Sequence, residues 1–240
     1  MEIEAYILVH NEERLMPYIM RHYSQFAKVV ILENNSTDRS VDIAHSMGAT
    51  IWKYDIFDDK DELTLLDIRN NCWKDSKADW VIVVDADEFV YHPRLIKVLE
   101  KTNKTAFIPV FYNMFSDTFP ITDGQIYEEV QYGSRGDEWD KALNKKMNLF
   151  KPSELTEINY GPGCHTTKPE GNVKIGKLKS LMTLHMRFLS RQYVIDNYKM
   201  QAQRISPINK ENNWSGHYEW SEEVINKFFD DRIPNLIKVL

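Results

Sequence analysis

Short apolar runs alternate with amphipathic stretches over the first half of the chain, and this alternation predicts repeated strand–helix units. Apolar residues at helical spacing predict the helices, the first over residues 12–25. Gly48 follows a helix expected to end at Met47 and is expected to supply its left-handed cap. The predicted fold class is α/β, a mixed, mostly parallel central sheet flanked by helices. Its buried strands are expected at residues 3–9, 29–32, 50–54 and 80–84.

The regular alternation fades after residue 84. No internal repeat, low-complexity tract or flexible linker interrupts the remainder. We therefore expect one domain at residues 1–205, followed by a loop and helix extension at 206–240. The later elements are expected as helices at 92–100, 190–205 and from 222, and as strands at 106–112, 145–150 and 178–187.

Composition narrows the function classes. The formal net charge of −6 offers no global basic field, so general nucleic-acid binding is not expected. Cys72 and Cys164 are expected to be reduced thiols, because nothing in the composition suggests a disulfide scaffold. The start of the chain lacks the pattern of a secretory signal, and no apolar stretch approaches the roughly 20 residues of a membrane span. We expect a cytoplasmic protein whose membrane contact, if any, is peripheral.

An acidic motif follows the strand predicted at 80–84, with Asp85, Asp87 and Glu88 inside four residues. Unpaired buried charge costs several kcal/mol, so these carboxylates must meet a cation or solvent. The carboxyl end of a parallel strand is also where open sheets bind ligands. Carboxylates at positions i and i+2 suit a hard cation such as Mg²⁺ or Mn²⁺. The motif predicts a metal site, and a solvated acidic turn is the alternative.

Four sequence blocks between residues 9 and 89 resemble the family 2 glycosyltransferases, in particular their cytosolic-type branch with short catalytic domains. Two weaker matches follow, Gly163-Cys164-His165 and Leu184-His185-Met186-Arg187. The resemblance implies the GT-A fold, with a nucleotide-sugar-binding half at 1–112 and an acceptor half at 113–205. The four blocks are Val9-His10-Asn11-Glu12-Glu13, Glu33-Asn34-Asn35-Ser36-Thr37-Asp38-Arg39-Ser40, Ile68-Arg69-Asn70 and Asp79-Trp80-Val81-Ile82-Val83-Val84-Asp85-Ala86-Asp87-Glu88-Phe89.

The same resemblance implies roles for individual residues. The end of the first strand would line the base and ribose of the donor, through Val9, His10, Asn11 and Glu12. The next loop would border the base through Asn35, Ser36 and Asp38, and Arg69 would lie against the nucleotide. The family's aspartate-any-aspartate motif falls on Asp85-Ala86-Asp87, with Asp87 closest to a Mn²⁺ or Mg²⁺ ion and Asp85 near the ribose or the metal. Glu33 and Asn34 stand where many relatives have aspartate.

Further site residues are expected in the second half. Fold relatives often supply one more metal ligand there, and His185 and His165 are the leading candidates, with His217 behind them. The resemblance favours inversion, which needs a carboxylate base at the acceptor hydroxyl. The segment around Trp139 offers three such acids, Asp137, Glu138 and Asp140.

The expected function is therefore that of a glycosyltransferase in glycan biosynthesis, of the hexosyl- or deoxyhexosyl-transferase class. Its donor would be a nucleoside-diphosphate sugar, with UDP as the expected nucleotide, and its acceptor a hydroxyl of a glycan or another molecule. A nucleotidyltransferase is one alternative, but it would ordinarily carry a Gly-rich loop where this chain has His10-Asn11-Glu12-Glu13. A non-catalytic nucleotide-sugar-binding relative is the other, and it would be expected to lose the motif carboxylates first.

Overall fold

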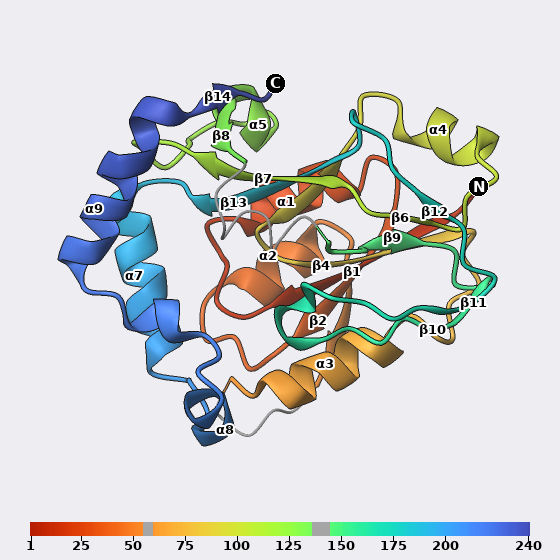
Figure 1. The fold of residues 1–240 in the computed structure, drawn as a ribbon, viewed down its shortest axis with the longest axis horizontal. Helices are drawn as coiled ribbons and strands as arrows, with labels where there is room; N and C mark the ends of the chain where they lie inside the picture. Colours follow the sequence, from red (N-terminus) through yellow and green to blue (C-terminus); the bar gives the residue numbers. More distant parts are fainter. Residues whose placement is uncertain (55–59, 136–144) are drawn as a thin grey trace.

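The computed structural model describes residues 1–54, 60–135 and 145–240. Its largest sheet has seven strands in the order β12-β6-β9-β4-β1-β2-β3 (Figure 1). The strands are β1 (Ile3–Val9), β2 (Lys28–Glu33), β3 (Thr50–Lys53), β4 (Trp80–Asp85), β6 (Ala106–Phe107), β9 (Leu149–Phe150) and β12 (Ile175–Gly176). All four strands predicted in the first half of the chain are present in this sheet, and Gly48 has the positive φ of a left-handed cap.

Four neighbouring strands, β4, β1, β2 and β3, run parallel. The register sets Leu8 opposite Asp85 and Val9 opposite Glu33, so the carboxyl ends of β1, β2 and β4 meet at one edge of the sheet. This is the edge at which open parallel sheets bind ligands.

Helices cover both faces of this sheet, and β1 is therefore buried on both sides. Ile3, Ile7 and the other odd-numbered residues of β1 belong to a hydrophobic cluster with residues of the first helix. Tyr6 and Leu8 point the other way and share a cluster with Leu65 of the third helix. The helices of the first half are α1 (Met16–Tyr23), α2 (Ser40–Ser46), α3 (Glu62–Asn71) and α4 (Leu95–Lys101).

A second sheet has five strands in the order β14-β8-β7-β13-β5. Its strands are β5 (Glu88–Tyr91), β7 (Val110–Phe115), β8 (Tyr132–Ser134), β13 (Met182–Phe188) and β14 (Ile237–Lys238). The chain leaves the first sheet at the end of β4 and enters the second at the start of β5. Ala86 and Asp87 therefore form the link between the two sheets.

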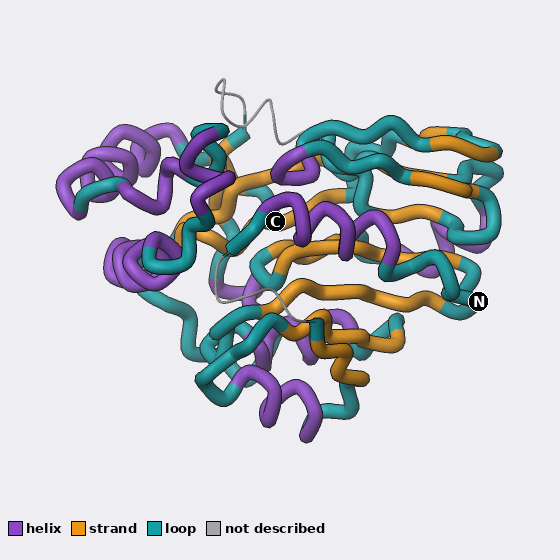
Figure 2. Tube along the Cα trace, turned by 90° about the horizontal axis from the view of Figure 1, so that it is seen from below, coloured by secondary structure: helices purple, strands orange, loops and turns teal. Residues whose placement is uncertain are grey.

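The helices α7 (Arg191–Ala202), α8 (Pro207–Glu211) and α9 (Glu222–Arg232) gather at the end of the molecule opposite the N-terminus (Figures 1 and 2). Helices α7 and α9 pack around Phe115 and Phe188 of the second sheet, with Tyr198 and Phe229 buried in the same cluster. The remaining elements are α5 (Ile126–Glu129), β10 (Leu155–Glu157), η1 (Pro162–Cys164), β11 (Glu170–Gly171), η2 (Gly216–Glu219) and η3 (Ile233–Asn235). In the part of the chain described, none of the helices has the length and apolar character needed to cross a membrane.

The single strand expected at residues 106–112 is wrong. The structure has two strands there, β6 and β7, and they belong to different sheets. Pro109 lies between them, and its missing N–H cannot contribute to a continuous ladder.

Candidate active site

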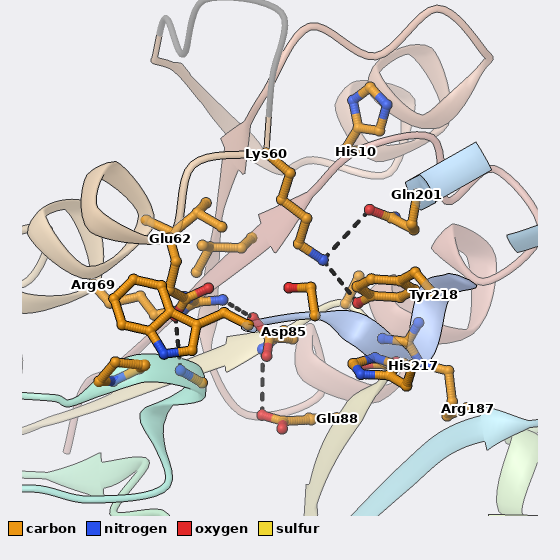
Figure 3. A pocket seen from close by; sticks show the side chains of 18 of the residues that line it. His10, Lys60, Glu62, Arg69, Asp85, Glu88, Arg187, Gln201, His217 and Tyr218 are labelled. Carbon is orange, nitrogen blue, oxygen red and sulfur yellow. Dashed lines mark hydrogen bonds and ion pairs between the residues drawn. The ribbon is translucent and has the colours of Figure 1, made fainter. Parts of the chain in front are cut away.

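A cavity of about 380 Å³ opens at the carboxyl ends of β1 and β4. Both halves of the chain contribute to its wall, and Figure 3 shows side chains from each side pointing into it. From the first half the lining includes Val9, His10, Glu12, Asn34, Lys60, Glu62, Arg69, Asp85, Ala86, Asp87 and Glu88. From the second half it includes Lys146, His165, His185, Arg187, Tyr198, Gln201, Arg204, Trp214, His217 and Tyr218.

Asp85 is held by two basic side chains. Arg69, in the last turn of α3, donates from Nη2 to Asp85 Oδ1 at 2.6 Å, and Lys146 Nζ lies 3.0 Å from Oδ2. Burial acts to raise the pKa of the Asp85 carboxyl, but the charges of Arg69 and then Lys146 lower it well below its usual value. Both carboxylate oxygens of Asp85 therefore already have cationic partners.

Lys146 also neutralises the last acid of the motif, because its Nζ lies 2.5 Å from Glu88 Oε1. Lys146 and Glu88 are 5% and 3% exposed, so the charges are buried together. A buried carboxylate without such a partner would cost several kcal/mol. Lys146 could not be identified from the sequence, because a lone lysine 61 residues from Asp85 carries no spacing signal.

Asp87 faces the second sheet. Its Oδ2 lies 3.2 Å from His185 Nε2 and 2.7 Å from Arg187 Nε, both on β13. Although burial raises the pKa of the Asp87 carboxyl, the charges of Arg187 and then His185 lower it below its ordinary value. The antiparallel register of β13 with β5 sets His185 opposite Glu88 and so brings these side chains together.

Asp87 and His185 are the side chains that would hold a cation at this place, because Asp87 Oδ2 and His185 Nε2 lie 3.2 Å apart. His185 Nδ1 lies 2.7 Å from Asn113 Oδ1, and in the tautomer that donates this hydrogen bond Nε2 presents a lone pair beside Asp87 Oδ2. Adjacent ligands of an octahedral Mg²⁺ ion are about 3 Å apart, given its bond lengths. Among the described residues no group of three His, Cys, Asp or Glu side chains could hold a metal ion, so a cation here would need ligands from the substrate as well. The residues present fit such a shared site.

Two further histidines of the cavity, His165 and His217, lie at the end of η1 and within η2. Gly163 has φ +65° and an added Cβ would lie 2.6 Å from His165 Nε2, so only glycine allows His165 its position. Burial, followed by the charge of Lys146, lowers the pKa of His165 to about 4. The ring of His217 lies 4.1 Å from that of Tyr218, and burial lowers the pKa of His217 to about 3. Both are neutral at physiological pH.

Of the predicted nucleotide contacts at the end of β1, Val9, His10 and Glu12 line the cavity. His10 Nδ1 lies 2.6 Å from the carbonyl oxygen of Asn34, which orients the ring. Burial, with the neighbouring charge of Asp87 adding to it, raises the pKa of Glu12 to about 8. Glu12 is therefore mostly protonated at neutral pH.

Arg69, Asp85 and Ala86 also line the cavity, whereas the lining does not include Asn11, Asn35, Ser36 or Asp38. Asn11 Oδ1 accepts a hydrogen bond from the backbone N–H of Thr37 at 2.7 Å, and Ser36 Oγ accepts one from Asn11 N at 3.1 Å. Asp38 Oδ2 accepts a hydrogen bond from Glu13 N at 3.0 Å. These bonds tie the β1–α1 loop to the β2–α2 loop, which also contains Asn35. Asp137, Glu138 and Asp140 lie outside the described residues.

Several cavity residues were not identified from the sequence. Arg187 had a usable signal, since it closes the Leu184-His185-Met186-Arg187 block. Lys60, Glu62, Arg204 and Tyr218 had none, because they come from loops and helix ends whose meeting depends on the tertiary fold.

The acidic motif lies at the carboxyl end of a parallel strand and faces a cavity beside a second sheet, which is the place where open α/β sheets bind ligands. The model of the glycosyl transferase family 2 matches residues 6–163, which is more than half of the chain. The chain belongs to this family. Its mostly parallel sheet flanked by helices is the GT-A fold that the resemblance implied.

Solved structures resemble the chain at low identity. Residues 1–349 of TarS from S. aureus are 11% identical, with 98% of this chain and 74% of that chain covered and a TM-score of 0.49. Glucosyl-3-phosphoglycerate synthase from Mycobacterium tuberculosis, solved with Mn²⁺, UDP and glucosyl-3-phosphoglycerate, is 14% identical over 86% of this chain and 81% of that chain, at a TM-score of 0.46. A mycobacterial protein is 15% identical, with 87% of this chain and 76% of that chain covered and a TM-score of 0.46. Among curated proteins, none matches the chain.

Proposed function

We propose that this protein transfers a hexosyl or deoxyhexosyl group from a nucleoside-diphosphate sugar, with UDP as the expected nucleotide, to an acceptor hydroxyl. The observation that carries the proposal is the pairing of Asp87 with His185 at the edge where the parallel strands end. Family membership supports the reaction class. Asp87 and His185 would hold a Mn²⁺ or Mg²⁺ ion, which when bound supplies a Lewis acid for the diphosphate.

The chain's own residues prepare the site. Arg69 and Lys146 keep Asp85 ionised and fixed, so that its carboxylate can orient the donor without rearrangement. His10 and Asn34, at the ends of β1 and β2, offer polar contacts for the base and ribose. The extension at 206–240 supplies Trp214, His217 and Tyr218, which complete the wall.

We propose inversion at the anomeric carbon, with a carboxylate among Asp137, Glu138 and Asp140 as the base. In that reaction the acceptor oxygen attacks the face opposite the leaving diphosphate, and its proton passes to the carboxylate. Proton NMR of the new glycosidic linkage measures the outcome. Inverted configuration is expected, and retained configuration would reject this part of the mechanism.

The donor class can be tested by thermal unfolding with a panel of nucleotide sugars, with and without Mn²⁺. A ligand at one hundred times its dissociation constant stabilises the folded state by about 2.7 kcal/mol, so true donors raise the unfolding temperature. Stabilisation by nucleoside triphosphates but by none of the nucleotide sugars would instead support the nucleotidyltransferase alternative. Stabilisation without any turnover would support a non-catalytic binding protein.

A further inference from the structure

Tyr218 is a buried phenol in the cavity wall whose hydroxyl hydrogen has no acceptor among the described residues. Tyr218 is 6% exposed and belongs to η2. Lys60 Nζ lies 2.7 Å from its oxygen, and an ammonium group can only donate, so the phenol oxygen accepts this bond (Figure 3). The O–H of Tyr218 remains available for a further acceptor. A buried donor without one costs free energy that a ligand oxygen would recover.

The surroundings of Tyr218 favour a negatively charged ligand. Lys60 contacts the phenol and, at 3.4 Å, the amide oxygen of Gln201, and it has no carboxylate partner in the described part of the chain. The Arg187 guanidinium lies 5.8 Å from the centre of the Tyr218 ring. Burial acts to raise the pKa of Tyr218, yet the charges of Lys60 and Arg187 lower it below its ordinary value. Arg69, Lys146 and Arg187 each pair with a motif carboxylate, so Lys60 is the cation of this group that has no carboxylate partner among the described residues.

Lys60 is held in position through its backbone, and Tyr218 through the packing of its ring. Asn209, which is fully buried, donates from Nδ2 to the carbonyl oxygen of Lys60 at 2.9 Å and accepts from the backbone N–H of Glu62 at 3.1 Å. The Tyr218 ring packs edge-on against Tyr198 of α7, with 5.3 Å between ring centres. The pair is therefore preorganised, and a ligand would not have to order it.

We propose that Lys60 and Tyr218, with Arg187 beside them, bind the diphosphate of the donor and stabilise it as the leaving group. This inference rests on the proposed function and assigns part of the leaving-group stabilisation to the chain itself. In the transfer step the bond between the anomeric carbon and the diphosphate oxygen breaks, and its electron pair stays on the diphosphate. A bond forms from the acceptor oxygen to the same carbon, and the acceptor proton passes to a carboxylate base. The diphosphate gains negative charge, which Lys60 and the Tyr218 hydroxyl are placed to receive.

Inorganic pyrophosphate is the direct probe, because it carries the diphosphate chemistry without a base or a sugar. Its affinity should be measured by isothermal titration calorimetry in the presence of a chelator, so that no divalent ion contributes. The wild-type protein is expected to bind it, and Tyr218→Phe to bind it about tenfold more weakly, the loss of one hydrogen bond to a charged group. Lys60→Met should lose at least as much affinity for pyrophosphate. The affinity of the wild-type protein should fall with added salt. Tyr132→Phe, at an exposed tyrosine, is the matched control and should bind as the wild type does.

Phenylalanine fills the volume of tyrosine, so Tyr218→Phe tests the hydroxyl even where Lys60→Met does not fold. Unchanged pyrophosphate affinity in Tyr218→Phe would overturn the inference, as would the absence of binding by the wild-type protein. Turnover of a nucleotide sugar by wild-type protein alongside either result would leave the proposed function standing and reject only this site. Binding that depends on Tyr218, without turnover of any nucleotide sugar, would reject the proposed function and keep the anion site.

Discussion

Arg187 donates from Nε to Asp87 Oδ2 at 2.7 Å, at the same oxygen that His185 approaches. A cation that binds Asp87 must therefore compete with a guanidinium group. Replacing that charge removes the competitor, so Arg187→Gln should bind Mn²⁺ roughly tenfold more tightly in the absence of nucleotide. Electron paramagnetic resonance of free Mn²⁺ measures this directly. Arg191→Gln, which removes a guanidinium paired with the exposed Asp230, should leave the affinity unchanged. Equal or weaker binding by Arg187→Gln would place the metal elsewhere.

His185 is the second protein ligand that we propose. His185→Ala should weaken Mn²⁺ binding by about tenfold or more, since it removes one of two protein ligands. His92, a half-buried histidine that bonds to Ser180, provides the control variant His92→Ala. Electron paramagnetic resonance of free Mn²⁺ again measures the affinity, and circular dichroism checks that both variants are folded. Unaltered Mn²⁺ affinity in His185→Ala would show that its contact with Asp87 is structural.

Lys146 should be essential for stability rather than only for activity. Lys146→Met leaves Asp85 and Glu88 without their shared cation, and breaking a buried ion pair in this way costs about 3–5 kcal/mol. Urea unfolding measures the loss. Lys97→Met, on an exposed position of α4, should change the free energy of unfolding by less than about 0.5 kcal/mol. A comparably small change in the free energy of unfolding of Lys146→Met would mean that the fold does not need Lys146 to neutralise Asp85 and Glu88.

The sequence predicted the parallel half of the fold more fully than the second sheet. Strands β1, β2 and β4 are rich in buried apolar residues, so each reads as an apolar run without knowledge of its neighbours. Strand β5 begins inside the acidic motif and pairs with β13, whose residues lie more than 90 positions further along the chain. No local sequence pattern predicts a pairing between strands so far apart in the chain.

The same limit applies to the site. Asp85 and Asp87 could be predicted as candidate site residues because motif spacing and strand position are local features of the sequence. Their partners Lys146 and Arg187 come from distant segments, and only the fold brings them to the motif. His185 was predicted as a site residue from a short block of resemblance, and the structure places it beside Asp87.

His22 should make stability depend on pH. It is buried among aromatic rings, its Nδ1 has no hydrogen-bond partner, and burial lowers its pKa to about 4. In the unfolded chain the imidazole has its ordinary pKa near 6.5, so the unfolded chain takes up the proton first as pH falls. The stability present above pH 6.5 is therefore lost progressively between 6.5 and 4, by about 2 kcal/mol at pH 5.

Urea unfolding at pH 7 and pH 5 tests this for wild type and His22→Phe. The variant should lose about 2 kcal/mol less over that interval, whereas His45→Phe, at an exposed histidine of α2, should follow the wild type. The same pH dependence in His22→Phe and wild type would assign the effect to other groups.

The proposed function requires that the chain transfer a sugar from a nucleotide sugar by chemistry centred on Asp87. Release of nucleotide from a panel of UDP-, GDP- and TDP-linked sugars, measured with Mn²⁺ for wild type, Asp87→Asn and the exposed control Asp75→Asn, tests it most directly. Wild type and Asp75→Asn should release nucleotide from at least one donor. Asp87→Asn, and wild type in excess chelator, should be slower by roughly a hundredfold or more. No release from any donor by the wild-type protein, or an undiminished rate in Asp87→Asn, would contradict the account.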